Sequence, residues 1–238
     1  MTYLSGFVSP VPAANKEQYR RFAAESVAMF KGHGTTRLME AWEDDVPSGE
    51  VTDFRRAVDA RDGEVIVFSW QEFPDKAAAD TAGERIMNDP AMDEMMGKMP
   101  YDGSRMIYGG FDGLFEVGTR DAKPGYVDGS LIPVKTARKG DYLAALQRQA
   151  AIFTEAGAAR FVDAWGDAVP DGKLTDFKKA VRAQADETVV FSFIEWPSKE
   201  VRDAAWSRIY TDPRMQEDDP AGDEARRIFG GFVPLVDE

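Results

Sequence analysis

The chain has 238 residues, of which 43% are hydrophobic and 30% charged, and it contains no cysteine. This composition is that of a globular protein with one large or two small domains, and it excludes disulfides, a thiol nucleophile and cysteine-ligated metals. The net charge of -13 disfavours nucleic acid as a partner, because its phosphates would be repelled.

No segment has the pattern of a signal peptide, and no apolar run approaches the roughly 20 residues that a transmembrane helix needs. We therefore expect a cytoplasmic protein that has no membrane partner.

One stretch occurs twice. Residues 41–58 and 164–181 share Trp, Val-Pro, Gly, Thr-Asp-Phe and Ala-Val at the same spacing, at an offset of 123 residues. The same offset separates Tyr3 from Tyr126. It falls to 121 residues at the last Gly-Gly-Phe of each copy, so the second copy lacks two residues in the loop after its second helix. We predict a first repeat over residues 1–117, a linker over 118–125 and a second repeat over 126–238.

In the first repeat, residues 3–11 read as a strand that ends at prolines. Asn15, with Gln18 three residues later, predicts a capped amphipathic helix that glycines end. Residues 36–44 form a second strand, which carries Trp42 and leads into a polar loop that ends at Asp53.

Residues 64–72 are the strongest strand of the repeat. Pro74 and Asp75 open a second helix, which breaks at Asp89-Pro90, and residues 105–116 close the repeat as a fourth strand. The order βαββαβ is that of a ferredoxin-like unit of the α+β class, with four antiparallel strands and two helices on one face.

Strand residues are apolar on both faces, so the face without helices needs a cover. The second repeat can supply it, and the linker keeps it close. We therefore expect the two sheets to pack face to face within one chain, as an intramolecular pseudo-dimer, and the chain to be a monomer.

The motifs Y-x-x-G-F-V-x-P-V-P, W-x-D-x-V-P-x-G-x-x-T-D-F-x-x-A-V, V-F-S-W, D-P-x-M and M-I-Y-G-G-F together resemble the DUF1428 (YbaA-like) family, and the match covers nearly all of each repeat. The resemblance implies a dimeric α/β barrel, akin in fold to the antibiotic-biosynthesis monooxygenases, and it carries no assigned biochemical role. Members usually have one copy, and Ala41 and Ala164 stand where members often have cysteine.

The fold that the resemblance implies offers a pocket between each sheet and its helices. Trp42 and Trp165 can line these pockets, or they can simply fill the core. Asp53 and Asp176, in Thr-Asp-Phe, can orient a ligand or act as bases, but this position before a short turn also suits a helix cap.

Ser69 and Ser192 lie inside very apolar strands, where each hydroxyl needs a partner in a pocket or across the sheet. His33 is the only histidine, and its counterpart is Ala156. The resemblance implies that members often have histidine here. It can be an acid–base residue at a pocket or a solvated residue at the helix end.

Arg105 and Arg226 stand in equivalent places at the start of the last strand of each repeat. Each can hold an anionic ligand through two hydrogen bonds, or form a salt bridge to one of the many carboxylates. No nucleophilic triad is repeated, and we assign no catalytic residue. With one histidine and no cysteine we expect neither a metal nor a cofactor.

Two functions remain open. The first is small-molecule binding in the sheet–helix pockets, with or without cofactor-free enzymatic activity. It rests on the fold that the resemblance implies and on the repeated Trp, Asp and Ser positions, with His33 and the two arginines as further candidate ligand-binding residues. The alternative is a non-catalytic structural or stress-related interaction module, whose repeated residues only secure the fold.

Overall fold

The computed structural model describes residues 2–120, 123–215 and 221–238. Two residues of the predicted linker, 121 and 122, lie outside these ranges, as do residues 216–220 in the stretch where the second repeat is expected to be shorter. The first half contains these elements: β1 (Tyr3–Pro12), α1 (Lys16–Gly32), β2 (Arg37–Asp45), α2 (Phe54–Ala57), β3 (Glu64–Phe73), α3 (Lys76–Met87), α4 (Pro90–Gly97) and β4 (Ile107–Gly118).

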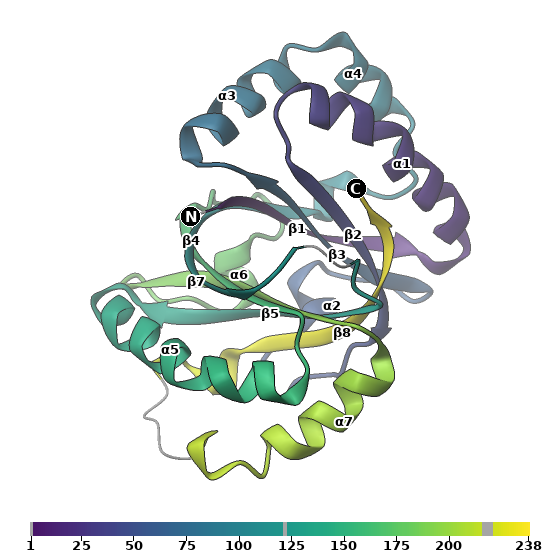
Figure 1. Ribbon diagram of the computed structural model, residues 1–238. Helices are drawn as coiled ribbons and strands as arrows, with labels where there is room; N and C mark the ends of the chain where they lie inside the picture. The colour runs from purple at the N-terminus through teal and green to yellow at the C-terminus, as the bar shows by residue number, and fades with distance from the viewer. Residues whose placement is uncertain (1, 121–122, 216–220) are drawn as a thin grey trace.

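The second half repeats the order with these elements: β5 (Tyr126–Lys135), α5 (Lys139–Ala156), β6 (Arg160–Ala168), α6 (Phe177–Ala180), β7 (Glu187–Trp196), α7 (Lys199–Ile209) and β8 (Ile228–Asp237). Figure 1 shows α1, α3 and α4 on one side of the strands and α5 and α7 on the opposite side. The predicted βαββαβ order of each half is confirmed.

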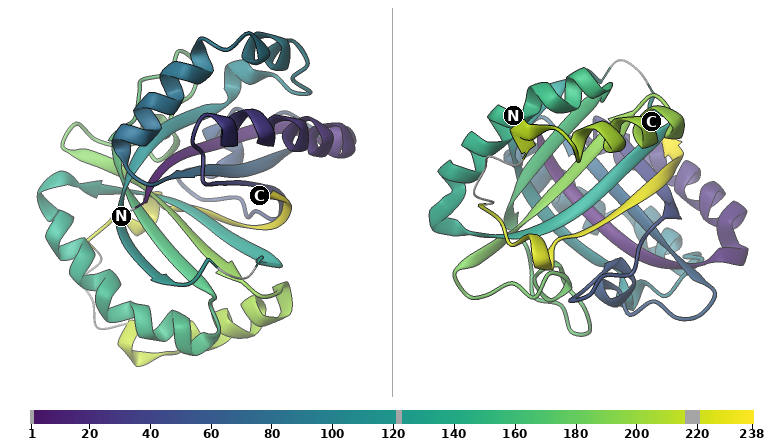
Figure 2. Two further views of the ribbon diagram at one scale, coloured as in Figure 1. Left: turned by 45° about the horizontal axis from the view of Figure 1, so that its top comes forward. Right: turned by 90° about the horizontal axis from the view of Figure 1, so that it is seen from below.

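The eight strands close into one antiparallel barrel in the order β1-β3-β2-β8-β5-β7-β6-β4. Each half contributes four neighbouring strands, and the halves join where β2 pairs with β8 and β4 pairs with β6. Figure 2 shows the strands curving round a common centre with the long helices outside. The expected intramolecular α/β barrel is confirmed, and its two sheets are also hydrogen-bonded edge to edge.

Side chains from both halves fill the barrel interior. The rings of Phe68 and Phe191, equivalent residues of β3 and β7, stack with their centroids 4.6 Å apart. Two positions along, Trp70 stacks on Phe193 at 4.0 Å. A Cβ at Gly6 would lie 2.7 Å from the Phe191 ring, so β1 approaches the opposite half more closely than any other residue type would allow. The interior is therefore a packed core.

Helix starts follow the sequence signals in most places. The helix α3 begins after Pro74 and Asp75, as predicted, and Asp75 caps it by accepting a hydrogen bond from the amide of Ala78 at 2.8 Å. The predicted capping role of the Asn15 side chain is wrong. A 3-10 turn precedes α1, and the Asn15 amide donates to the carbonyl of Pro100 at 2.8 Å instead. Asn15 thus ties α1 to the segment before β4.

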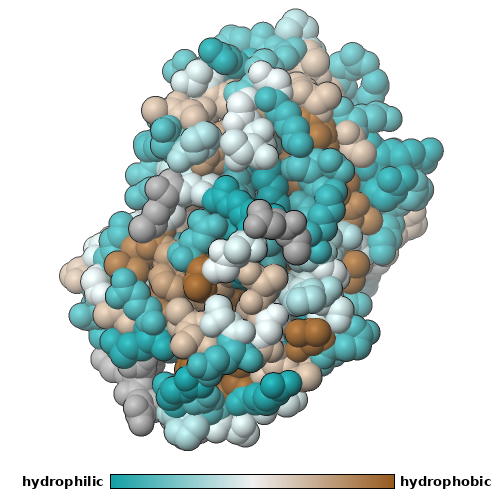
Figure 3. Space-filling view, in the orientation of Figure 1, coloured by the Kyte–Doolittle hydropathy of each residue, from teal (hydrophilic) through white to brown (hydrophobic). Residues whose placement is uncertain are grey.

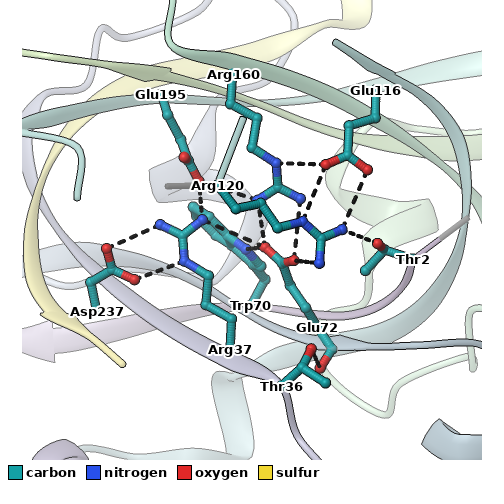
Figure 4. Close-up of polar contacts among 10 residues, drawn as sticks. All are labelled: Thr2, Thr36, Arg37, Trp70, Glu72, Glu116, Arg120, Arg160, Glu195 and Asp237. Carbon is teal, nitrogen blue, oxygen red and sulfur yellow. Dashed lines mark hydrogen bonds and ion pairs between the residues drawn. The ribbon is translucent and has the colours of Figure 1, made fainter. Parts of the chain in front are cut away.

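Buried ion pairs cross between the halves at one end of the barrel (Figure 4). Arg37 of β2 donates to Glu195 of β7 at 2.6 Å, and the equivalent Arg160 of β6 donates to Glu72 of β3 at 2.6 Å. Both glutamates are fully buried. Removing one partner would leave a buried charge uncompensated, so these contacts fix how the halves fit together.

One face of the molecule is mostly polar. Figure 3 shows a largely hydrophilic face, with hydrophobic residues in small patches rather than one continuous area. None of the described helices is long and apolar enough to cross a membrane.

Candidate functional site

A cleft of about 450 Å³ lies beside α1 in the first half. One wall is formed by α1 and the opposite wall by the end of β8, with Lys123 and Pro124 nearby; the α1 and β8 residues that line it are Arg20, Ala24, Val27 and Pro234 to Glu238. We call it the α1–β8 cleft. Its lining combines aliphatic side chains with charged groups from Arg20, Lys123, Asp237 and Glu238. Such a lining suits a small organic molecule.

A carboxylate lies next to the wall of this cleft. Glu40 of β2 pairs directly with Val236 of β8, which lines the cleft. Directly paired residues point to the same face of a sheet, so both side chains lie on the outer face, under α1. There the hydroxyl of Tyr19, from α1, donates to Oε2 of Glu40 at 2.6 Å. Glu40 keeps a partly exposed surface, whereas Tyr19 is buried.

Burial raises the pKa of the Glu40 carboxyl to about 7, although hydrogen bonds from Tyr19 and Ser69 oppose the rise. Burial also raises the pKa of Tyr19 far above its usual range, so its hydroxyl stays protonated and donates. Glu40 is therefore a group that takes up and releases a proton near neutral pH. That property is needed by an acid–base group and is useful in a hydrogen-bonding ligand site.

Aromatic rings enclose this carboxylate. The Tyr19 ring lies 6.1 Å from the Trp42 ring and 5.7 Å from the Tyr101 ring. The ammonium of Lys16 lies 5.4 Å from the centre of the Trp42 ring. The Tyr19–Glu40–Ser69 group thus lies in the layer between the sheet and its helices.

The second half repeats this group but closes it. Tyr142 donates to Asp163, the equivalent of Glu40, at 2.9 Å, and a hydrogen bond from Ser192 lowers the pKa of Asp163. Burial has the larger effect and raises that pKa to about 6. Asp163 is only 1% exposed, and its Oδ2 has no partner among the described residues.

Three substitutions between the halves explain why the second group is closed. Phe115 takes the place of Val236 and pairs with Asp163 across β4 and β6. Leu143 takes the place of Arg20, and Val117 takes the place of Glu238. All three residues pack against the hydrophobic core of the second half. Phe115 is larger than Val236, and Leu143 and Val117 replace charged side chains with apolar ones, so the region around Asp163 is covered by a packed apolar layer.

Among the residues singled out by sequence, Ser69, Ser192, Trp42 and Trp165 lie in these two groups. The tryptophans are 6% and 8% exposed, and both belong to the sheet–helix cores. Neither tryptophan lines the α1–β8 cleft or the cleft beside His33 that is described below.

Asp53 and Asp176 lie elsewhere, at the starts of the short helices α2 and α6. Asp53 accepts from the amide of Arg56 at 2.8 Å, and Asp176 accepts from the amide of Lys179 at 2.7 Å. Both are buried caps, which is the second of the two roles open to them from sequence.

Arg105 and Arg226 are held by the protein's own acceptors. Arg105 makes two hydrogen bonds to Glu64, at 2.6 and 2.7 Å, and one to the carbonyl of Asp59 at 2.8 Å. Asp59 has a φ of 49°, a left-handed conformation that costs free energy in a residue other than glycine. The second half repeats this arrangement with Arg226. The arginines stabilise strained turns.

His33 lies in a second cleft, of about 500 Å³, formed by residues 84–85 and 88–90. Its Nε2 lies 2.7 Å from Oδ2 of Asp89, so the ring joins the end of α1 to the start of α4. Glu40 is not among the residues that line this cleft. The described residues contain no group of three His, Asp or Glu side chains placed to hold a metal ion.

Sequence reasoning missed the pairs Tyr19–Glu40 and Tyr142–Asp163. A signal was present: the offset of 123 residues aligns tyrosine with tyrosine and carboxylate with carboxylate. In both repeats the carboxylate interrupts an apolar strand one residue before the alanine and tryptophan. The repetition marks the position, but a carboxylate in a strand does not by itself show that it is buried.

Two solved structures share the fold over nearly the whole chain. A candidate monooxygenase from Fusobacterium nucleatum has a TM-score of 0.63 at 12% identity, covering 100% of this chain and 94% of its own. A candidate monooxygenase from Lactobacillus acidophilus has a TM-score of 0.59 at 12% identity, covering 99% and 95%. At this identity the likeness concerns the fold alone.

At the level of sequence, the chain is 49% identical over 116 residues to the uncharacterized protein YbaA of Escherichia coli K12, which covers 49% of this chain and 99% of the relative. The family described as "Protein of unknown function (DUF1428)" matches twice, at residues 2–103 and 125–224. The chain therefore belongs to the DUF1428 family and carries its pattern twice in tandem.

Proposed function

We propose that the chain binds a small organic molecule in the α1–β8 cleft, with Glu40 as the carboxylate that lies next to its Val236 wall. One observation carries the proposal. A carboxylate with a pKa near neutral lies beside a cleft of about 450 Å³ in one half, whereas the equivalent carboxylate is closed off in the other.

The composition of the cleft indicates the kind of ligand. Ala24, Val27 and Leu235 favour an apolar body. Glu40 accepts hydrogen bonds when ionised and donates one when protonated, so it suits a hydroxyl or carbonyl group. The solved structures described as candidate monooxygenases support small-molecule binding as a use of this fold. The proposal takes no oxygenation chemistry from them, because their likeness is one of fold.

The second half has a structural role in this proposal. Phe115 and Leu143 pack against the hydrophobic core there, and Asp163 is buried. The chain then has one binding cleft, beside α1, and a closed counterpart beside α5.

The test is a thermal-shift screen against a metabolite library with matched variants. Val236→Phe places a phenylalanine in the cleft, as Phe115 does beside Asp163, and Phe115→Val makes the reverse change at that equivalent position as a control. We expect compounds that raise the melting temperature of the wild type and of Phe115→Val but not of Val236→Phe. Glu40→Gln should reduce the rise in melting temperature that is caused by compounds in contact with the carboxylate.

Two outcomes would contradict the proposal. One is a screen without any stabilising compound. The other is a set of stabilising compounds whose effects persist in both Val236→Phe and Glu40→Gln, because such compounds would bind elsewhere.

A further inference from the structure

The ion pairs at the barrel end follow the pseudo-two-fold symmetry of the halves up to a point. Arg37 bridges Glu195 and Asp237, with donor–acceptor distances of 2.6 and 2.7 Å. Its equivalent Arg160 bridges Glu72 and Glu116, at 2.6 and 2.9 Å. Each arginine therefore joins a glutamate of the other half to the end of a strand (Figure 4).

The symmetry does not extend to the other hydrogen-bond donors around the two buried glutamates. Glu72 also accepts from the indole of Trp70 at 3.1 Å, and its Oε2 lies 3.1 Å from Nη1 of Arg120. Arg120 comes from the segment after β4 and contacts Glu116 as well, so it binds two carboxylates at once. Figure 4 shows its guanidinium facing both of them.

On the other side these donors are missing. Phe193 stands where Trp70 stands in the first half and has no N–H to donate. No described residue occupies the place beside Glu195 and Asp237 that Arg120 occupies beside Glu72 and Glu116. Glu195 is fully buried, yet its Oε2 has no hydrogen-bond partner among the described residues.

The charges lead to the same conclusion. Three arginines (Arg37, Arg120 and Arg160) face four carboxylates (Glu72, Glu116, Glu195 and Asp237), so the group lacks one positive charge. Lys123 is close, but its ammonium donates to the backbone carbonyl of Asp237 and pairs with Glu238. A buried carboxylate without full compensation destabilises a fold, and a cation that reaches it is bound with a corresponding gain.

We propose that Glu195 and Asp237 form a binding site for the guanidinium or primary ammonium group of a small molecule. The bound group repeats the contact that Arg120 makes with Glu72 and Glu116. Charge-assisted hydrogen bonds to two carboxylates give such a group both affinity and orientation. Asp237 keeps part of its side chain exposed at the end of β8, so the group meets solvent on that side. The inference holds whether or not Glu40 contacts a ligand.

The test uses methylguanidinium as the probe and tetramethylammonium, which has the charge but no N–H donor, as the control salt at equal ionic strength. The wild type should show a saturable rise in melting temperature with methylguanidinium, on the order of 2–4 °C. Glu195→Gln keeps the size of the side chain and removes its charge, and it should abolish the rise.

Arg120→Ala provides a second test that does not depend on altering Glu195. It vacates the equivalent place on Glu72 and Glu116, so the variant should melt lower than the wild type and respond more strongly to methylguanidinium. In the double variant Arg120→Ala/Glu195→Gln, methylguanidinium should still raise the melting temperature, but only by binding to Glu72 and Glu116. Glu40→Gln should keep the full wild-type response, which separates this site from the proposed function of the cleft.

A wild type that does not respond, with an Arg120→Ala variant that does, would overturn the proposal. It would mean that a proton held by Glu195 itself, rather than an external cation, balances the charge. Equal responses of the wild type and Glu195→Gln would also overturn it.

Discussion

The substitution Glu40→Gln should change the stability of the protein in a way that depends on pH. Burial raises the pKa of Glu40 from 4.5 to about 7, so the folded state holds this proton more tightly than the unfolded chain does. Below about pH 4.5 the carboxyl is protonated in both states, and the raised pKa has no cost. As the pH rises through 7, the folded state must carry a buried charge, and stability is lost.

The size of the effect follows from the shift of about 2.5 pKa units, each worth about 1.36 kcal/mol, which gives about 3 kcal/mol. It is an upper value, because Glu40 keeps a partly exposed surface that solvent screens. Glutamine can still accept the hydrogen bond from Tyr19 but never ionises. The variant should therefore gain stability relative to the wild type by up to about 3 kcal/mol between pH 5 and pH 8.

The assay is urea unfolding of both proteins at pH 5, 6, 7 and 8, with the free energy of unfolding extrapolated to water. Asp163→Asn is the matched control. The pKa of Asp163 rises from 3.8 to about 6, so most of its effect is complete by pH 6 and its difference from the wild type should change little from pH 7 to 8. If the difference between Glu40→Gln and the wild type stays flat from pH 5 to 8, the carboxylate is not buried as described.

Three further substitutions test the barrel, each by urea unfolding. Phe191→Ala removes the ring that stacks on Phe68 at 4.6 Å, and it should cost about 3–5 kcal/mol. Gly129→Ala places a Cβ 2.8 Å from the same Phe68 ring, and it should cost about 1–3 kcal/mol. Arg37→Met removes the closest partner of the buried Glu195, and it should cost about 3–5 kcal/mol.

Each of these predictions has its own contrary result. A loss below about 1 kcal/mol for Phe191→Ala would mean that the interior is loosely packed, and a stabilising Gly129→Ala would mean that the halves lie further apart. For the ion pairs the control is Arg20→Met, which removes an exposed pair with Glu17 and should cost less than about 1 kcal/mol. Equal losses for Arg20→Met and Arg37→Met would contradict the role given to burial.

Sequence periodicity was enough to predict the elements of each half, because strands such as residues 64–73 are apolar and bounded by turn residues. The caps at Asp75 and Asp53 were also readable, since both follow local rules. The closure of the barrel could not be predicted from the sequence. The β2–β8 pairing shifts register between Glu40 and Ala41, and such a bulge depends on contacts between residues almost 200 positions apart.

The candidate site was less predictable than the fold. Glu40 is one of several charged residues in β2, and a charged residue in a strand usually marks a solvent-facing position. Its partner Tyr19 comes from another element, so the pair exists only in three dimensions. Arg105 illustrates the opposite case: its sequence position allowed an anion site, but the fold supplies Glu64 and the Asp59 carbonyl as partners.

The cross-half contacts in the interior have a consequence for how such a protein diverges. In an assembly of two identical chains, a residue on the axis meets a copy of itself, so one mutation alters both sides of the contact. Fusion separates the two positions, and each can then change alone. Trp70 against Phe193 is such an unequal pair. A chimera built from two copies of either half would bring back an equal pair, two tryptophans or two phenylalanines, for which the present neighbours were never selected.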